Sequence, residues 1–265
     1  MSRKPVLKME ALTVSIGNQP ILADVELSIA AGECVALLGE SGSGKSMTAR
    51  AALGLLPPQA RLAGRVEVNG RDVSGASALS RDGAARPAMV MQDTLSALNP
   101  LTSIGYQLEW PLRRSGLGRA EARAEARRLL ADVGLPDPEQ IAARSSPELS
   151  GGQRQRVCIA IALACAAPVI IADEPTSALD VVTQAQILQL LKSVTVAPGG
   201  PGLLFITHDL HAAAHLCDRA LVIEAGRVVE AGPMRRILTE PQHPHTRRLI
   251  ASAASCGIAC ERLYA

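Results

Sequence analysis

The fold is decided by Gly39-Glu40-Ser41-Gly42-Ser43-Gly44-Lys45-Ser46. This stretch matches the phosphate-loop pattern G-x-x-x-x-G-K-S, follows an apolar segment at residues 33–38 and precedes a helical pattern. Its glycines let the backbone bend so that successive N–H groups point at phosphate oxygens. Lys45 would place a positive charge on the β- and γ-phosphates, and the hydroxyl of Ser46 is a suitable Mg²⁺ ligand. The strand–loop–helix context predicts an α/β domain that binds a nucleotide here.

Length and composition indicate one full α/β domain with room for a subdomain. The chain has 265 residues, of which 48% are hydrophobic, so we expect a sizeable core. Its net charge is +2 and its aromatic content is 2%. Nucleic-acid binders concentrate basic charge and stacking platforms, so we expect no nucleic-acid partner. No apolar stretch follows the basic N-terminus, so we expect no secretory signal and an intracellular protein.

A second segment that we expect to bind phosphate is Leu149-Ser150-Gly151-Gly152-Gln153. Serine and two glycines at a helix start expose backbone N–H groups, and such a helix start attracts phosphate. Together with the phosphate loop, this pentapeptide predicts two nucleotide surfaces per subunit. The apolar run at 157–172 is short for a membrane span and is interrupted by Pro168, so it predicts a buried helix followed by a buried strand.

Polar residues follow the predicted buried strands at 169–172 and 202–207. Asp173 and Glu174 end the first strand, and His208 follows the second. Ligands of α/β sheets bind at the carboxyl edge, so these three side chains are candidates for the nucleotide site. Asp173 would hold Mg²⁺, Glu174 would polarise the attacking water as general base, and His208 would hydrogen-bond the γ-phosphate. The alternative for Asp173 and Glu174 is a charged strand end without a catalytic role. The alternative for His208 is a purely structural histidine.

Gln92 ends a short predicted strand at 89–91, where a helical stretch begins. A glutamine there can contact Mg²⁺ or water, so it is a candidate relay between nucleotide state and movement of the helical stretch. The alternative is that Gln92 is a surface residue without a role in the nucleotide site.

Two further groups of residues invite a metal interpretation, which we do not favour. His243 and His245 are separated by a proline, and we expect loop structure there rather than a metal site. Cys256 and Cys260 form a close pair, but a metal or cluster usually needs four ligands. The six cysteines lack metal spacing, and most lie in apolar contexts typical of core residues.

The pattern along the chain predicts an α/β core interrupted by a helical insertion. Strands are expected at 8–14, 25–29, 33–38, 64–68, 89–91, 169–172 and 202–207, with a turn at 18–20 and a hairpin at 220–224 and 227–230. Helices are expected at 47–56, 119–133 and 181–194. The domain assignment is 1–92 and 151–240 for the core, 93–150 for the helical subdomain and 241–265 for a short tail.

These motifs, in this order, resemble the ATP-binding subunit of an ABC transporter. The matching segments are residues 39–46 (Walker A), Gln92 (Q-loop), 149–153 (signature), 170–174 (Walker B), 177–180 (D-loop) and His208 (switch histidine). The resemblance implies a P-loop NTPase core, with a RecA-like mixed sheet and an antiparallel β subdomain, plus the inserted helical subdomain of ABC type. It implies ATP and Mg²⁺ as cofactors.

The resemblance also implies roles for the individual residues. The catalytic residues would be Glu174, His208 and Gln92, and the Mg²⁺ ligands would be Ser46, Gln92 and Asp173. ATP would lie between two ATPase subunits arranged head to tail. The phosphate loop of one subunit would face the signature of its partner, namely Ser150, Gly151, Gly152 and Gln153.

A finer likeness is to the oligopeptide/dipeptide/nickel importer group. It is carried by residues 92–100, by 171–181 and by the tail element at 243–247. Within that group the chain resembles the first of two paired ATPases, and its short tail is more similar to nickel importers than to peptide importers. The cargo implied is nickel, free or chelated, or di- and oligopeptides. A soluble ABC-type ATPase acting on DNA or ribosomes is the alternative, but such relatives carry a long coiled coil or two heads in one chain.

The same likeness implies partners and a location. The partners implied are two membrane permease subunits, a second ATPase (a paralogue or a second copy) and, indirectly, an extracytoplasmic substrate-binding protein. The location implied for this subunit is peripheral, at the cytoplasmic face of the inner membrane. One departure from the family is at Ile16, where an aromatic residue often stacks on adenine. We expect apolar contact in its place.

Overall fold

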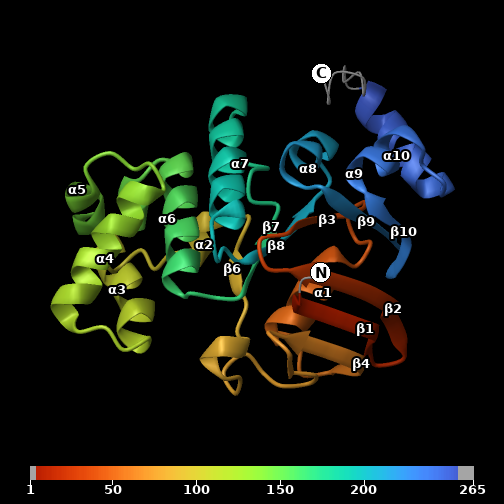
Figure 1. Ribbon diagram of the computed structural model, residues 1–265, viewed down its shortest axis with the longest axis horizontal. Helices are drawn as coiled ribbons and strands as arrows, with labels where there is room; N and C mark the ends of the chain where they lie inside the picture. Colours follow the sequence, from red (N-terminus) through yellow and green to blue (C-terminus); the bar gives the residue numbers. More distant parts are fainter. Residues whose placement is uncertain (1–3, 256–265) are drawn as a thin grey trace. The chain divides into compact units, whose positions relative to one another are not determined.

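The computed structural model describes residues 4–255, which form two compact units (Figure 1). The first unit contains residues 4–87, 168–174 and 192–255. The second contains residues 88–167 and 175–191. Each unit is described by itself.

The first unit is built on a sheet whose strands in this unit follow the order β10-β9-β3-β8-β7. The strands are β3 (Cys34–Leu38), β7 (Val169–Asp173), β8 (Gly202–Thr207), β9 (Arg219–Glu224) and β10 (Arg227–Pro233). All neighbours are parallel except the β9–β10 hairpin. Every residue of β3 and β8 is buried, which explains their continuous apolar sequences. Leu38 pairs with Thr207, and Asp173 pairs with Ile206, so three strands end at one edge.

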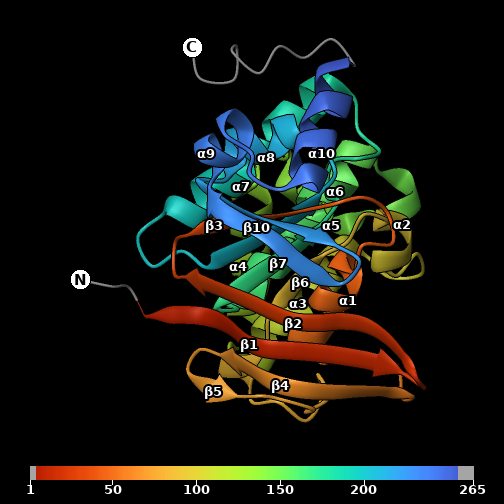
Figure 2. The same cartoon turned by 90° about the vertical axis from the view of Figure 1, so that its right-hand side faces the viewer.

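An antiparallel sheet with the order β2-β1-β4-β5 completes the β structure of this unit (Figure 2). Its strands are β1 (Pro5–Ile16), β2 (Gln19–Ala30), β4 (Ala60–Val68) and β5 (Arg71–Asp72). The predicted turn at 18–20 is wrong by one or two residues, because Ile16 pairs with Gln19 and the turn lies at 17–18. Pro20 is tolerated in β2 because β2 lies at the edge of this sheet. The two sheets confirm the predicted α/β fold with an antiparallel β part.

The helices of the first unit are mostly short. They are α1 (Lys45–Leu53), the 3₁₀ turn η1 (Gly83–Ala85), α8 (Leu210–Leu216), α9 (Met234–Thr239) and α10 (Pro244–Ser255). The expected loop at 243–245 is wrong for His245, because Pro244 begins α10, and proline is favoured at the first helical position. His245 is buried, and its Nδ1 lies 3.1 Å from Glu224 Oε1. In the described part of the chain no group of three or more His, Cys, Asp or Glu side chains could hold a metal ion. Cys256 and Cys260 lie outside the described residues.

The second unit is mainly helical. It contains β6 (Ala88–Val90), α2 (Thr94–Ala97), α3 (Ile104–Arg114), α4 (Arg119–Asp132), α5 (Pro138–Ala143), the 3₁₀ turn η2 (Ser146–Glu148), α6 (Gly151–Ala164) and the first part of α7 (Val181–Val196). The expected helix at 119–133 is confirmed as α4. The expectations do not include α3, whose interior holds Pro111, a residue that normally argues against a helix. No helix among residues 4–255 combines the length and apolarity needed to cross a membrane.

Arg81 connects a surface segment to the C-terminal end of α1. Its side chain is buried, with 5% exposed, and its guanidinium donates to the carbonyl oxygens of Ala51 (3.4 Å), Ala52 and Ala76 (3.1 Å). A cation at this end of a helix complements the negative end of the helix dipole.

We predict that Arg81→Ala lowers the free energy of unfolding by about 2–3 kcal/mol, because the carbonyls of Ala52 and Ala76 lose the donors that Arg81 supplies. Urea unfolding followed by circular dichroism measures the change. The matched control is Arg65→Ala, which removes an exposed arginine paired with Glu67 and Asp72 and should cost less than about 1 kcal/mol. Equal losses in the two variants would contradict the capping role.

Candidate functional site

The loop at residues 39–44 presents the N-terminus of α1 at the carboxyl end of β3. Gly44 has a φ of 112°, and a Cβ there would lie 2.7 Å from Leu22 Cδ2, so only glycine suits the position. The Gly226 N–H donates to the Ser43 carbonyl at 2.8 Å and holds the loop against the β9–β10 turn. Ser43 Oγ is buried and has no hydrogen-bond partner among the described residues. The loop therefore offers backbone N–H groups and one unused hydroxyl to an anion.

Lys45 lies inside this loop. Its side chain is largely buried, and Nζ donates to the carbonyl oxygens of Gly39 and Glu40, both at 2.8 Å. Burial lowers the pKa of Lys45, and the carboxylates of Glu174 and Asp173 oppose that effect. The loop carbonyls and nearby carboxylates favour the charged amine, which can contact phosphate oxygens bound in the loop.

Ser46 and Asp173 meet beside the lysine. The Ser46 hydroxyl donates to Asp173 Oδ2 at 3.2 Å. Burial raises the pKa of Asp173, while the hydrogen bond from Ser46 acts in the opposite direction. A hydroxyl and a carboxylate side by side are the hard oxygen ligands that Mg²⁺ prefers. The residues present thus fit a divalent cation bound together with phosphate.

Glu174 and His208 form the third contact at this edge. Glu174 Oε1 lies 3.0 Å from His208 Nδ1, and the Glu174 N–H donates to the Ile206 carbonyl at 2.9 Å. Glu174 has a φ of 46°, a conformation that costs of order 1–3 kcal/mol for a non-glycine residue and is typical of functional sites. An imidazole N–H can donate to a carboxylate oxygen, so this contact can hold the Glu174 side chain in orientation.

The signature pentapeptide lies in the second unit and begins α6. The Ser150 side chain accepts from the Gln153 N–H at 3.3 Å, and Gln153 Oε1 accepts from the Ser150 N–H at 2.9 Å. This reciprocal capping box fixes the start of the helix. A Cβ on Gly152 would lie 2.7 Å from Thr183 Cγ2, so a larger residue would push the helix away from α7.

Gln92 lies close to the signature within the second unit. It is exposed after β6 and borders a cavity of about 340 Å³. The other residues lining this cavity are Asp93, Thr94, Leu95, Gly151, Arg154, Gln155, Pro175, Ala178 and Leu179. Gln155 is 2% exposed, and its Nε2 has no partner among the described residues. Sequence reasoning missed Gln155, although its position one helical turn after Gly151 places it on the same face of α6.

The predicted site residues thus form two groups, one in each unit. The first group contains residues 39–46, Asp173, Glu174 and His208; the second contains Gln92 and Ser150–Gln153. The first group combines an anion-binding loop, a cation-binding pair and a carboxylate–imidazole pair. This set can bind a phosphorylated ligand with a divalent cation and can take a proton from a water molecule.

The raised pKa of Asp173 predicts the direction in which replacing this residue changes stability. Because its pKa is raised in the folded protein, its contribution to stability is present below the unfolded pKa of about 3.9 and is lost as pH rises through the folded pKa. At pH 7 the ionised carboxylate therefore lowers the free energy of unfolding. Asp173→Asn should raise the urea midpoint of the ligand-free protein at pH 7, and the gain should shrink towards pH 4.

Asp72→Asn is the control, and it should change the urea midpoint in the opposite direction. A hydrogen bond from the Ser74 hydroxyl lowers the pKa of Asp72, so its stabilising contribution is present at pH 7 and is lost on acidification. Its replacement should lower the urea midpoint slightly. A lower midpoint for Asp173→Asn at pH 7 would show that the buried carboxylate is compensated in full by its neighbours.

Comparison with known proteins identifies the family. The sequence model of the family described as ABC transporter matches residues 22–177. A Brucella abortus protein named as a peptide import ATP-binding protein is 41% identical over 98% of this chain and 81% of its own length. An Escherichia coli protein named for D,D-dipeptide transport ATP binding is 42% identical over 96% of this chain and 80% of its own length.

A solved structure agrees with these sequence relatives. The dimeric post-hydrolysis state of an ATP-binding cassette bound to ADP and Pi superimposes with a TM-score of 0.71 and 30% identity, covering 86% of this chain and 98% of that one. With matching motifs, the expected loop geometry and relatives that align over nearly its whole length, this chain belongs to the ABC transporter family.

Proposed function

We propose that this chain hydrolyses ATP and thereby powers an importer for small peptides. The observation that carries the proposal is the contact of Glu174 with His208 at 3.0 Å, at the same sheet edge as Lys45 and the phosphate loop. A general base must lie near the bound phosphates and be held in orientation by a partner. The membership of the ABC transporter family supports the same chemistry.

The reaction follows from the roles of these side chains. The N–H groups of residues 39–46 and the Lys45 amine bind the β- and γ-phosphates and stabilise the charge that develops there. Glu174 accepts a proton from water, whose oxygen bonds to the γ-phosphorus as the bond to the ADP oxygen breaks. His208 Nδ1 orients Glu174; a hydrogen bond from the same ring to the γ-phosphate would use Nε2 and requires an N–H there as well. When bound, Mg²⁺ neutralises phosphate charge; Ser46, Asp173 and Gln92 would hold it.

We assign the signature to the partner's ATP. Ser150, Gly151, Gly152 and Gln153 would contact the γ-phosphate held by a second ATPase, because the capped start of α6 presents N–H groups to an anion. The dimeric structure bound to ADP and Pi supports a paired arrangement. Gln92 would relay the state of the nucleotide to residues 93–150, the segment we assign as the helical subdomain.

Small peptides are the cargo that the relatives favour. The two sequence relatives are named for peptide import and for D,D-dipeptide transport, and neither is named for nickel or for action on DNA or ribosomes. We propose that two permease subunits and an extracytoplasmic binding protein complete the importer, with this subunit at the cytoplasmic face of the inner membrane. Nickel is the second candidate cargo, because residues 92–100 and 171–181 resemble an importer group that includes nickel importers.

Glu174→Gln tests the general base. Removing the base should lower the rate of phosphate release at least about 100-fold while ATP still binds, because the loop and Lys45 are unchanged. Phosphate release and retention of labelled ATP on the protein measure the two effects. Glu40→Gln makes the same chemical change at an exposed position of the same loop and should keep turnover. Unchanged turnover in Glu174→Gln would refute the assignment.

Uptake by a strain that lacks this chain tests the cargo. We expect uptake of a labelled dipeptide to be lost and uptake of labelled nickel to be unchanged. The wild-type chain should restore dipeptide uptake, and the Glu174→Gln variant should not. Loss of nickel uptake alone would replace peptide by nickel as the cargo, and no change in either would refute the proposed importer for these substrates.

A further inference from the structure

The turn between β9 and β10 is bonded to the phosphate loop and to β2. Its two residues, Ala225 and Gly226, have φ values of 46° and 77°, the geometry of a two-residue hairpin turn. The Gly226 N–H donates to the Ser43 carbonyl at 2.8 Å, and the Gly226 carbonyl accepts from the Ala23 N–H at 2.9 Å. A Cβ on Gly226 would clash with the carbonyl of Ile21, so only glycine suits this position. The turn is therefore held between β2 and the loop.

The end of β9 also lies against both ends of the phosphate loop. A Cβ on Gly39 would lie 2.5 Å from the carbonyl oxygen of Ile223. A Cβ on Gly44 would lie 3.4 Å from Ile223 Cδ1 and 3.4 Å from the Cα of Gly226. A loop that binds phosphate through backbone N–H groups loses conformational freedom when the ligand binds, and a support that fixes it beforehand raises the affinity. The β9–β10 turn is in a position to give that support.

Glu224, the residue just before this turn, is held by α10. Arg248 Nη2 donates to Glu224 Oε1 at 2.8 Å, and His245 Nδ1 lies 3.1 Å from the same oxygen. The His245 side chain is 3% exposed, and its Nε2 has no partner among the described residues. A proton on Nε2 would be buried without an acceptor, whereas a proton on Nδ1 faces a carboxylate. Figures 1 and 2 show α10 beside the β9–β10 hairpin.

A second carboxylate of the same hairpin fixes the start of α10. Glu230 of β10 accepts from the N–H groups of Gln242 at 2.9 Å and His243 at 3.0 Å, immediately before Pro244 begins the helix. Negative charge at this end of a helix is favourable. One hairpin therefore binds α10 at two points, at its start and beside the turn that supports the phosphate loop.

We propose that His245, Arg248 and Glu224, here named the α10 clamp, position the phosphate loop through the hydrogen bond from Gly226 to Ser43. When α10 holds the side chain of Glu224, the adjacent turn keeps one conformation and the Ser43 carbonyl keeps its donor. Without the clamp the turn and the loop sample other conformations, and the nucleotide binds more weakly. The clamp residues are positioning residues, because they act through the turn. The inference deepens the proposed function and rests on it for nucleotide as the ligand of the loop.

His245 contributes more to the clamp than Arg248. The Arg248 side chain is 63% exposed, and an exposed ion pair adds little stability. His245 contacts the same oxygen from a buried position, where a hydrogen bond is shielded from water. We therefore expect Arg248→Ala to weaken nucleotide binding less than the removal of the imidazole does.

Binding of ADP with Mg²⁺ to the full chain, measured by calorimetric titration, tests the clamp without hydrolysis. His245→Leu removes the ring nitrogens, and the Kd should rise at least about fivefold, the effect of losing one hydrogen bond of ordinary strength. His245→Asn keeps an N–H donor near the position of Nδ1 and should restore most of the affinity. The KM for ATP should rise by the same factor with kcat unchanged, because Glu174 and His208 are intact.

A matched pair of variants separates positioning from plain stability. Glu224→Ala and Glu33→Ala remove half-buried carboxylates at opposite ends of β9, where Glu33 accepts from Arg219 Nε at 2.8 Å. Glu224→Ala should weaken ADP binding and speed the hydrogen exchange of the Gly226 amide, followed by NMR. Glu33→Ala should lower stability and leave both the affinity and the exchange of this amide unchanged.

Several results would overturn the proposal. They are unchanged ADP affinity in His245→Leu and Glu224→Ala, equal weakening by Glu33→Ala, and failure of His245→Asn to restore affinity. If His245→Leu does not fold, Glu224→Ala decides. A chain that binds no nucleotide would refute the proposed function, and the Gly226 amide would still test the clamp. Equal exchange of that amide in wild type and Glu224→Ala would then overturn it.

Discussion

The register of the parallel sheet in the first unit is the constraint on which the candidate site depends. Leu38 of β3 pairs with Thr207 of β8, and Asp173 of β7 pairs with Ile206. Three strands from distant parts of the chain therefore end at one edge, where ligands of α/β sheets bind. Glu174 and His208, the residues after β7 and β8, lie 3.0 Å apart there. A shift of one residue in any of these strands would turn its terminal side chain to the other face.

The charges gathered at this edge are unfavourable for the empty protein. Lys45 and Asp173 are both desolvated, and burial shifts the pKa of each towards its neutral form. Glu174 adds an unusual positive φ. Each feature costs stability and each becomes useful when phosphate and a divalent cation occupy the site. Such local costs are typical of functional sites and are offset by the fully buried strands beneath them.

A structural feature could be predicted from the sequence where residues close together along the chain specify it. Residues 39–46 and the strand ends at Asp173 and His208 were predicted because motif spacing and continuous apolar runs are local properties of the sequence. The helix α3 was missed because Pro111 lies inside it, and its stability comes from packing of Ile104, Leu108 and Leu112. Features that rely on long-range contacts were also missed.

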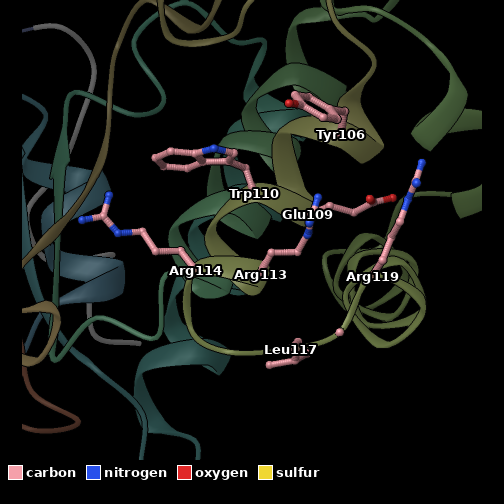
Figure 3. Close-up of a pocket in the computed structure, with 8 residues that line it drawn as sticks. Tyr106, Glu109, Trp110, Arg113, Arg114, Leu117 and Arg119 are labelled. Carbon is pink, nitrogen blue, oxygen red and sulfur yellow. The ribbon is translucent and has the colours of Figure 1, made fainter.

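Those long-range features are the buried Arg81, which caps α1 from a distant segment, and the orphan amide of Gln155. No pattern along the chain shows which carbonyls an arginine will reach. Tyr106 and Trp110, which are exposed on α3 (Figure 3), belong to the same class, because exposure is known only once the inner face of the helix is known.

The most direct test of the account is calorimetric titration of the chain with ATP and Mg²⁺, comparing wild type with Lys45→Met. Methionine keeps the length of the side chain and removes its charge, so the loop should remain folded while its central cation is lost. We expect one nucleotide per chain in the wild type, and at least tenfold weaker binding in the variant. Equal affinity in the two proteins would contradict the claim that the phosphate loop and Lys45 bind the nucleotide.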